Sequence, residues 1–227
     1  ASIIDVGGES TRPGAAPVSE QEELDRVLPV VEALAKEVDA VISLDTSSPQ
    51  VITEASRAGA GLINDVRALS RPGALSAAKD SGLPVCLMHM QGEPRSMQHN
   101  PNYDDVVCDV KAFLQERVIA CEKAGIRRER IWLDPGFGFG KSQRHNYQLL
   151  QRLQAFHELQ LPLLVGMSRK SMIGHITGRE VKDRLAGSLA AATIAAMKGA
   201  RIIRVHDVKE TVDAMKVVAA TIEGEHL

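Results

Sequence analysis

The sequence is poor in aromatic residues and cysteine, and it has no excess of either charge. Of 227 residues, 3% are aromatic, and 27 basic side chains oppose 29 acidic ones, for a net charge of −2. A chain with this balance has no field that would attract nucleic acid or an anionic membrane, so any anion site has to be local. The 3 cysteines lack metal-ligand spacing, which favours a reduced cytoplasmic protein.

Long apolar runs are also absent. No run approaches the roughly 18 residues of a membrane span, and the first residues have neither a basic start nor a signal-peptide core. The chain opens directly on an apolar run, and we therefore expect residues to be missing upstream. The hydrophobic content is 44%, and the composition shows no break along the chain where a second domain could start. This predicts one N-terminally truncated domain over residues 1–227.

Seven short apolar runs each end on a polar or ionisable residue, and each is followed by helical spacing. The runs cover residues 3–5, 41–45, 62–65, 85–89, 131–134, 163–165 leading into 166–168, and 202–206. They are nearly continuous, as is typical of parallel strands covered on both faces. The spacing predicts helices over residues 19–38, 49–58, 72–81, 104–124, 145–159, 181–199 and 208–223.

This alternation predicts the α/β class, as either an open doubly wound sheet or a (β/α)₈ TIM barrel. Two features favour the barrel, here missing its first β/α unit. Seven strand-helix units look like eight with the first removed, and polar residues end all seven strands rather than gathering at one switch point. No dinucleotide fingerprint or Walker-type phosphate loop follows any strand.

Three polar residues, Asp45, Asn64 and Asp134, end three different strands. In a barrel they converge on one pocket mouth. Two carboxylates and an amide suit a flat, nitrogen-rich ring, because a carboxylate accepts two parallel N–H bonds from a guanidine-like edge. The alternative is that each side chain only caps the following helix or turn.

Two glycine-rich loops follow strand ends. Residues 133–141 hold three glycines with Phe137 and Phe139 between them, so the backbone could approach a ligand closely while the rings either contact it or fold back onto the rim. Residues 7–14 carry a hydroxyl and an arginine, which suggests a loop that closes over substrate, although an ordinary flexible connection would look the same.

The end of the chain carries candidate anion ligands. Barrels often bind phosphate near the loops after their seventh and eighth strands. With the missing unit counted, residues 166–171 follow strand seven, and Arg204 and His206 lie at strand eight. The alternative is a solvated charge run. His89, a single histidine at a strand end, is more typical of hydrogen-bonded structure than of a ligand.

Metal chemistry of the zinc type is not expected. The sequence has no three-ligand cluster with the spacing of a catalytic zinc site. Magnesium held mainly by substrate phosphates would need only one or two protein oxygens, so it remains compatible with the chain.

Six segments of this chain closely resemble bacterial dihydropteroate synthases, in order and over essentially its whole length. They are residues 5–14, 64–66, 88–90, 134–141, 168–171 and 203–207. The resemblance implies a TIM-barrel transferase of folate biosynthesis. Such an enzyme joins 6-hydroxymethyl-7,8-dihydropterin diphosphate to p-aminobenzoate, forming 7,8-dihydropteroate and pyrophosphate. It also implies Mg²⁺ as cofactor, a homodimer, and a target of sulfonamides.

The resemblance assigns residue roles position by position. The pterin contacts are Asp45, Asn64, Asp134 and Lys170, with Met88 and Gly166 lining that pocket; the diphosphate pair is Arg204 and His206; the mobile loop has Thr11, Arg12 and Pro13; and Phe139, Lys170 and Ser171 lie beside p-aminobenzoate. Lys170, Arg204 and His206 are the implied catalytic residues. The family's metal-binding asparagine lies in an N-terminal strand and loop without a counterpart here. We therefore expect no metal ligand in this chain, and we expect it to be poorly stable or inactive alone.

Three other functions stay open. A pterin-binding methyltransferase domain would share the acidic pterin contacts but would have no use for a diphosphate site. An aldolase-like enzyme would use Lys170 as a Schiff base. A non-catalytic pterin-binding module or inactive fragment would bind without turnover. The small residues of the helix from Leu185 to Ala200 either pack closely on the barrel or form the homodimer surface.

Overall fold

The computed structural model describes residues 1–227 except 12–13, 94–96, 99 and 225–227. Within this part of the chain, seven strands are β1 (Ile3–Val6), β2 (Val41–Asp45), β3 (Leu62–Asp65), β4 (Val85–Met88), β5 (Ile131–Asp134), β6 (Leu164–Val165) and β7 (Ile202–Ile203). All of their pairings are parallel and join strands that are consecutive in the chain. Parallel neighbours need long crossovers, and helices supply them.

Strands β5 and β6 connect the two parts of the sheet. Leu133 forms an isolated parallel bridge with Leu163, and its amide donates to the carbonyl of Pro162 at 2.9 Å. The strand order therefore runs from β1 to β7 without a switch point. This agrees with the predicted barrel topology, and no pairing among the described residues closes β7 onto β1.

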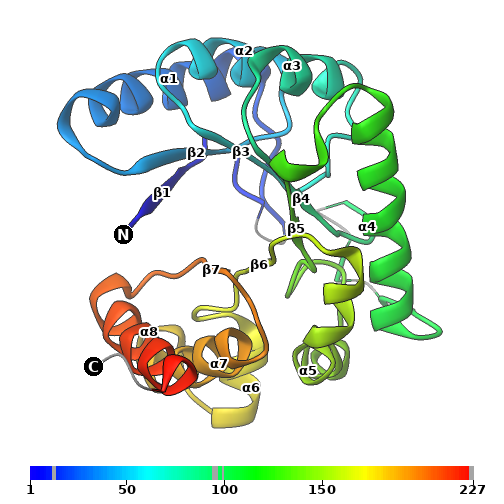
Figure 1. The fold of residues 1–227 in the computed structure, drawn as a ribbon, viewed down its shortest axis with the longest axis vertical. Helices are drawn as coiled ribbons and strands as arrows, with labels where there is room; N and C mark the ends of the chain where they lie inside the picture. Colours follow the sequence, from blue (N-terminus) through cyan, green and yellow to red (C-terminus); the bar gives the residue numbers. More distant parts are fainter. Residues whose placement is uncertain (12–13, 94–96, 99, 225–227) are drawn as a thin grey trace.

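Helices cover the outside of the curved sheet (Figure 1). They are α1 (Glu20–Glu37), α2 (Pro49–Arg57), α3 (Ala74–Ser81), α4 (Val106–Lys123), α5 (Gln143–Gln151), α6 (Ser171–Thr177), α7 (Leu185–Met197) and α8 (Val208–Glu223). Local sequence sets their starts: the Ser19 hydroxyl accepts from the Glu22 amide ahead of α1, and Asp105 caps α4 in the same way. Successive helices pack side by side, as α7 does on α8.

One predicted helix is shorter than expected, and the α-helix α6 was not predicted. The helix expected over 145–159 ends at Gln151, because Arg152 leaves helical geometry (φ −108°, ψ 24°), and residues 153–159 form a 3₁₀ helix. Short 3₁₀ helices also precede β5 (Arg128–Arg130) and α7 (Val181–Asp183). Helix α6 has only 7 residues, too few for a periodic pattern to reveal it.

The core is deepest under the middle of the sheet. Every residue of β4 is buried, whereas every residue of β1 and both residues of β7 are only half-buried. One apolar cluster fills the space from β3 to β6, and a second lies among α1, β2 and α2. Burial therefore decreases toward β1 and β7, each of which pairs with one strand among the described residues.

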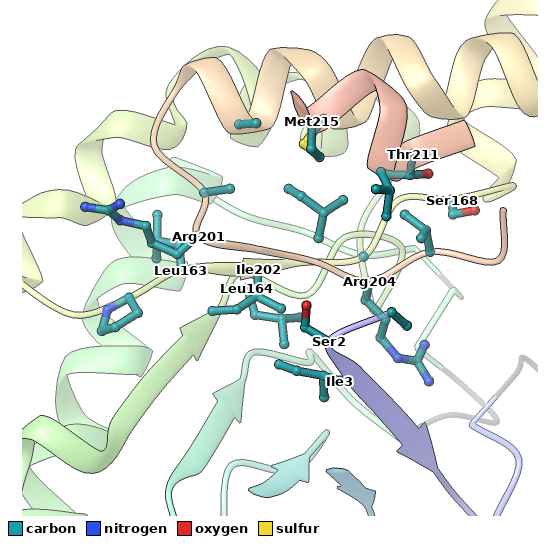
Figure 2. Close-up of a pocket in the computed structure, with 18 of the residues that line it drawn as sticks. Ser2, Ile3, Leu163, Leu164, Ser168, Arg201, Ile202, Arg204, Thr211 and Met215 are labelled. Atoms are coloured by element: carbon teal, nitrogen blue, oxygen red, sulfur yellow. The ribbon is translucent and has the colours of Figure 1, made fainter. Parts of the chain in front are cut away.

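A cavity of about 1410 Å³ lies between β1 and β7 (Figure 2). Its walls include Ile3 and Ile202 from the two strands, and Met215 from α8. At one end the cavity reaches the polar side chains Ser168 and Arg204 (Figure 2). Over the described residues, none of the helices combines the length and apolar character that crossing a bilayer requires.

Candidate active site

Polar side chains from five strands gather at one end of the sheet. Asp5 lies in β1, Asp45 ends β2, Asn64 lies in β3, Asp134 ends β5, and Arg204 follows β7. Because all strands are parallel, their carboxyl ends share one rim. These strand positions agree with the predicted convergence of Asp45, Asn64 and Asp134 on one rim.

Arg204 connects three of these strands. Its Nε donates to Asp5 Oδ2 at 2.6 Å, and its Nη2 donates to Asp45 Oδ2 at 3.1 Å. Asn64 Nδ2 also donates to Asp5 Oδ2, at 3.1 Å. The guanidinium lies beside the edge of β1 (Figure 2). Sequence reasoning did not name Asp5 as a site residue, although it ends an apolar run as Asp45 and Asp134 do.

Burial and crowding perturb the ionisation of this cluster. Burial raises the pKa of Asp45 from 3.8 to about 7, the neighbouring charge of Asp5 adds to the rise, and Arg204 opposes it. Burial also raises the pKa of Asp134, against the opposing effect of Lys170. Burial lowers the pKa of Lys170 from 10.5 to about 8, while Asp134 counteracts the fall. Strongly perturbed groups of both signs at one rim are typical of a functional site.

The loop after β5 places an aromatic ring beside the lysine. Lys170 Nζ lies 4.7 Å from the centroid of the Phe139 ring and donates to the Phe137 carbonyl. Phe137 is fully buried in the core, so the prediction that it could fold back is correct for this ring. Asp134 Oδ1 accepts from the Gly136 amide at 2.7 Å, which fixes the carboxylate at the start of the loop.

A buried lysine holds this loop in place. Lys141 is only 2% exposed, and its Nζ donates to the carbonyls of Gly136 and Phe139, both at 2.9 Å. The same nitrogen lies 2.8 Å from His89 Nδ1. Burial, with the charge of Lys141, lowers the pKa of His89 from 6.5 to about 3, so this ring is neutral. His89 therefore has the structural role that was predicted for it.

The second predicted anion ligand, His206, lies against the segment after β6. His206 Nδ1 lies 3.0 Å from Ser168 Oγ, and the His206 amide donates to the same oxygen at 3.2 Å. Gly166 is buried, and a Cβ there would lie 3.6 Å from Arg204 Cβ and 4.0 Å from Lys170 Nζ. Arg169 Nε donates to Asp207 at 3.0 Å, whereas Lys170 contacts the loop after β5.

The remaining predicted residues have different positions. Met88 is buried at the end of β4, and Ser171 is exposed as the first residue of α6. Thr11 is half-buried in the loop after β1. The predictions for Arg12 and Pro13 lie outside the described residues.

No protein-only metal cluster is found in the part of the chain that the structure describes. It has no group of three His, Cys, Asp or Glu side chains that could hold an ion. One carboxylate oxygen, Asp5 Oδ1, is buried without a hydrogen-bond partner among the described residues. A cation that is held mainly by the phosphate oxygens of a ligand would need few protein ligands, and the described residues are compatible with an ion of that kind.

An all-parallel α/β fold with acidic, amide and basic groups at its carboxyl rim belongs to the class of barrel enzymes that bind small polar substrates. The family model described as pterin binding enzyme matches residues 1–206. The chain is 62% identical to dihydropteroate synthase of Escherichia coli K12 over 99% of its own length and 80% of that relative.

Solved structures agree. The dihydropteroate synthase of Yersinia pestis in a sulfonamide drug complex is 61% identical, with a TM-score of 0.97 over 98% of this chain and 81% of that one. The enzyme of Xanthomonas albilineans with 4-aminobenzoic acid is 52% identical, with a TM-score of 0.93 over 98% of this chain and 80% of that one. The chain belongs to the dihydropteroate synthase family of pterin-binding enzymes.

The function follows from this membership. The chain is a transferase of folate synthesis, which condenses 6-hydroxymethyl-7,8-dihydropterin diphosphate with p-aminobenzoate to give 7,8-dihydropteroate and pyrophosphate. The methyltransferase and aldolase-like alternatives have no support in these relatives.

Proposed function

We propose that the rim residues divide the substrate between a pterin half and a diphosphate half, with Arg204 between them. The observation that carries this proposal is the contact of Arg204 with carboxylates of β1 and β2 beside Asn64. Asp45 and Asp134 accept from the guanidine-like edge of the pterin, and Asn64 completes the set. Met88 and Gly166 line the same pocket.

Arg204 and His206 bind the diphosphate. Two of the five N–H donors of Arg204 contact Asp5 and Asp45, which leaves other donors for phosphate oxygens. The reaction is dissociative: the C–O bond to the diphosphate breaks first, and pyrophosphate leaves with the electron pair. Arg204 and His206 stabilise the charge that develops on the leaving oxygens.

Mg²⁺ accompanies the diphosphate. The ion would be held mainly by the phosphate oxygens of the substrate, so no residue of this chain is assigned to it. When bound, Mg²⁺ would neutralise part of the charge on the leaving group.

p-Aminobenzoate enters beside Phe139, Lys170 and Ser171, with Thr11, Arg12 and Pro13 in the loop that closes over it. Its amine attacks the cationic pterin methylene and then loses a proton. The pKa of Lys170, lowered to about 8, lets this residue take part in proton transfer near neutral pH. Sulfonamides, which resemble p-aminobenzoate, would compete for the same position.

The protein acts in the cytoplasm as a homodimer. Its described cysteines are all free, as in a reducing compartment. One face of α7 packs inward through Ser188, Ala191 and Ala195, whereas Ile194 and Met197 are 44% and 50% exposed. The buried face explains the small residues by packing, and the exposed pair is the surface for a second copy. Sedimentation velocity with Ile194→Lys tests the dimer.

The decisive experiment measures p-aminobenzoate-dependent pyrophosphate release from dihydropterin diphosphate with Mg²⁺. Asp134→Asn and Arg204→Gln are each expected to lower kcat/KM about a hundredfold or more, because each removes a charge-assisted contact to the reacting substrate. Their matched controls are Asp39→Asn and Arg57→Gln, which make the same charge changes on exposed side chains.

The outcomes separate the possible functions. Pyrophosphate release that depends on p-aminobenzoate and falls in both site variants supports the proposal. Pterin binding without release indicates a non-catalytic module, and transfer of a methyl group without pyrophosphate indicates a methyltransferase. Equal activity in site variants and controls means that the rim residues have been assigned wrongly.

A further inference from the structure

Asp5 is one carboxylate that links the two halves of the site. Its Oδ2 accepts from Arg204 Nε at 2.6 Å and from Asn64 Nδ2 at 3.1 Å. These partners are 199 and 59 positions away in the sequence. One carboxylate oxygen of Asp5 therefore contacts both Arg204, which is proposed to bind the diphosphate, and Asn64, which is proposed to bind the pterin.

The environment of Asp5 is built for this contact. The Asp5 side chain is 14% exposed, against 46% for Arg204, so the carboxylate is the anchored partner of the pair. Two residues further on, a Cβ on Gly7 would lie 3.0 Å from the Asp45 carbonyl oxygen and 3.1 Å from Asp45 Cβ. Glycine at this position lets the ends of β1 and β2 approach, which brings both carboxylates to the same guanidinium.

This arrangement has an energetic cost. Asp5 Oδ1 is buried without a hydrogen-bond partner among the described residues, and Asp5 adds a like charge beside Asp45. An unpaired oxygen and a like-charge pair lower stability, so they are typical of positions that serve function rather than folding.

We propose that Asp5 is a positioning residue of the synthase reaction, which orients Arg204 toward the diphosphate and Asn64 toward the pterin. The inference rests on the proposed roles of those two residues. An arginine side chain samples many rotamers, and a carboxylate on its Nε fixes the plane of the guanidinium, so that its outer donors face the ligand before the ligand arrives. The Asn64 amide is fixed in the same way by donating to Asp5.

The charge of Asp5 has a second, separable effect. It contributes to the raised pKa of Asp45, whose other charged neighbours are Arg204, Asp65 and Glu23. Neutralising Asp5 removes one like charge, so Asp45 stays ionised to a lower pH. The acid limb of the pH profile for the pterin substrate should then move to lower pH.

The test compares Asp5→Asn and Asp5→Glu with the unchanged chain. Both variants misplace or weaken the shared acceptor, and kcat/KM for dihydropterin diphosphate is expected to fall about tenfold to a hundredfold, as for one charge-assisted hydrogen bond. The KM for p-aminobenzoate is expected to stay the same. The acid limb moves in Asp5→Asn and stays in place in Asp5→Glu, which keeps the charge. Asp39→Asn is the control for charge, because Asp39 is exposed in the bend before β2.

The results can contradict the inference in three ways. A rise in the KM for p-aminobenzoate as large as the loss in kcat/KM for dihydropterin diphosphate would mean that Asp5 only supports the fold. An acid limb that does not move in Asp5→Asn would mean that the charge of Asp5 does not act on Asp45. If Asp5→Asn does not fold, as judged by circular dichroism, Asp5→Glu carries the comparison of the two substrates. A loss in Arg204→Gln without one in either Asp5 variant contradicts only this inference, whereas no loss in Arg204→Gln overturns the proposed function as well.

Discussion

Asp45 is an acid whose ionised form the folded chain disfavours. Burial, with the charge of Asp5, raises its pKa from 3.8 to about 7, so the folded state binds this proton more tightly than the unfolded state. The stability that this group contributes is fully present below pH 3.8 and is lost as the pH rises toward the folded-state pKa of about 7. Relative to the unchanged chain, Asp45→Asn should therefore be more stable at pH 8 than at pH 5, by about 1–3 kcal/mol. Urea unfolding at both pH values measures this difference.

Asp39→Asn is the control for that measurement, because it replaces the same carboxylate by an amide at an exposed position. Its effect on unfolding should be the same at both pH values. A pH-independent effect of Asp45→Asn would mean that the carboxylate is not desolvated. The same variant should lose pterin affinity, since the amide cannot accept a bidentate pair as a carboxylate does.

Some site residues could be predicted singly, whereas their contacts could not. Asp45 and Asp134 end apolar runs, and that pattern alone indicates a shared rim. The link through Asp5 joins residues 199 positions apart, and only the folded chain reveals it. Likewise, the sequence shows Lys141 as one more charge after a glycine loop, but the structure buries it against His89.

The loop after β5 packs tightly against the backbone of His89. A Cβ on Gly136 would lie 1.9 Å from the His89 carbonyl oxygen, and Gly136 has φ +71°. Gly136→Ala should therefore cost about 3 kcal/mol or more, by displacing the loop as well as by straining the backbone. Because the loop carries Phe139, the KM for p-aminobenzoate should rise. Thermal unfolding and steady-state kinetics give both quantities.

Gly178 provides the matched comparison. It has φ +66° at the end of α6, and a Cβ there meets no described atom within 4 Å. Gly178→Ala has the same backbone strain without the collision, so it should cost about 1 kcal/mol and leave KM unchanged. Similar costs for the two variants would show that the contact with His89 does not constrain the loop.

Element boundaries follow the local signals where those are strong. The helix expected over residues 19–38 is found at Glu20–Glu37, because the Ser19 cap and apolar spacing agree. The helix expected over 145–159 is wrong beyond Gln151, since its apolar residues continue while the backbone tightens to 3₁₀ geometry. An α-helix and a 3₁₀ helix each bury one apolar face, and the apolar spacing does not distinguish them over so few turns.

At the scale of the whole molecule, one opening dominates the fold. The strand order runs from β1 to β7 with a single isolated bridge joining its two parts, and the cavity of about 1410 Å³ lies between β1 and β7. The alternation of strands and helices predicted the parallel order. It could not predict the size of the opening, which depends on how far the sheet curves. Unpaired edges beside half-buried apolar residues are a liability for association.

The opening should be the least stable part of the molecule, and closing it should stabilise the whole. Fusing a designed strand-helix unit ahead of Ala1, which lines the cavity, would let one added strand pair with both β1 and β7. Amide hydrogen exchange in these two strands should then slow toward that of β4, which is buried throughout, and the thermal midpoint should rise. The same fusion with two prolines in its strand is the control, because proline cannot donate to the ladder. If both fusions slow exchange equally, the added mass rather than strand pairing protects these edges; if neither does, the sheet is not open to a further strand.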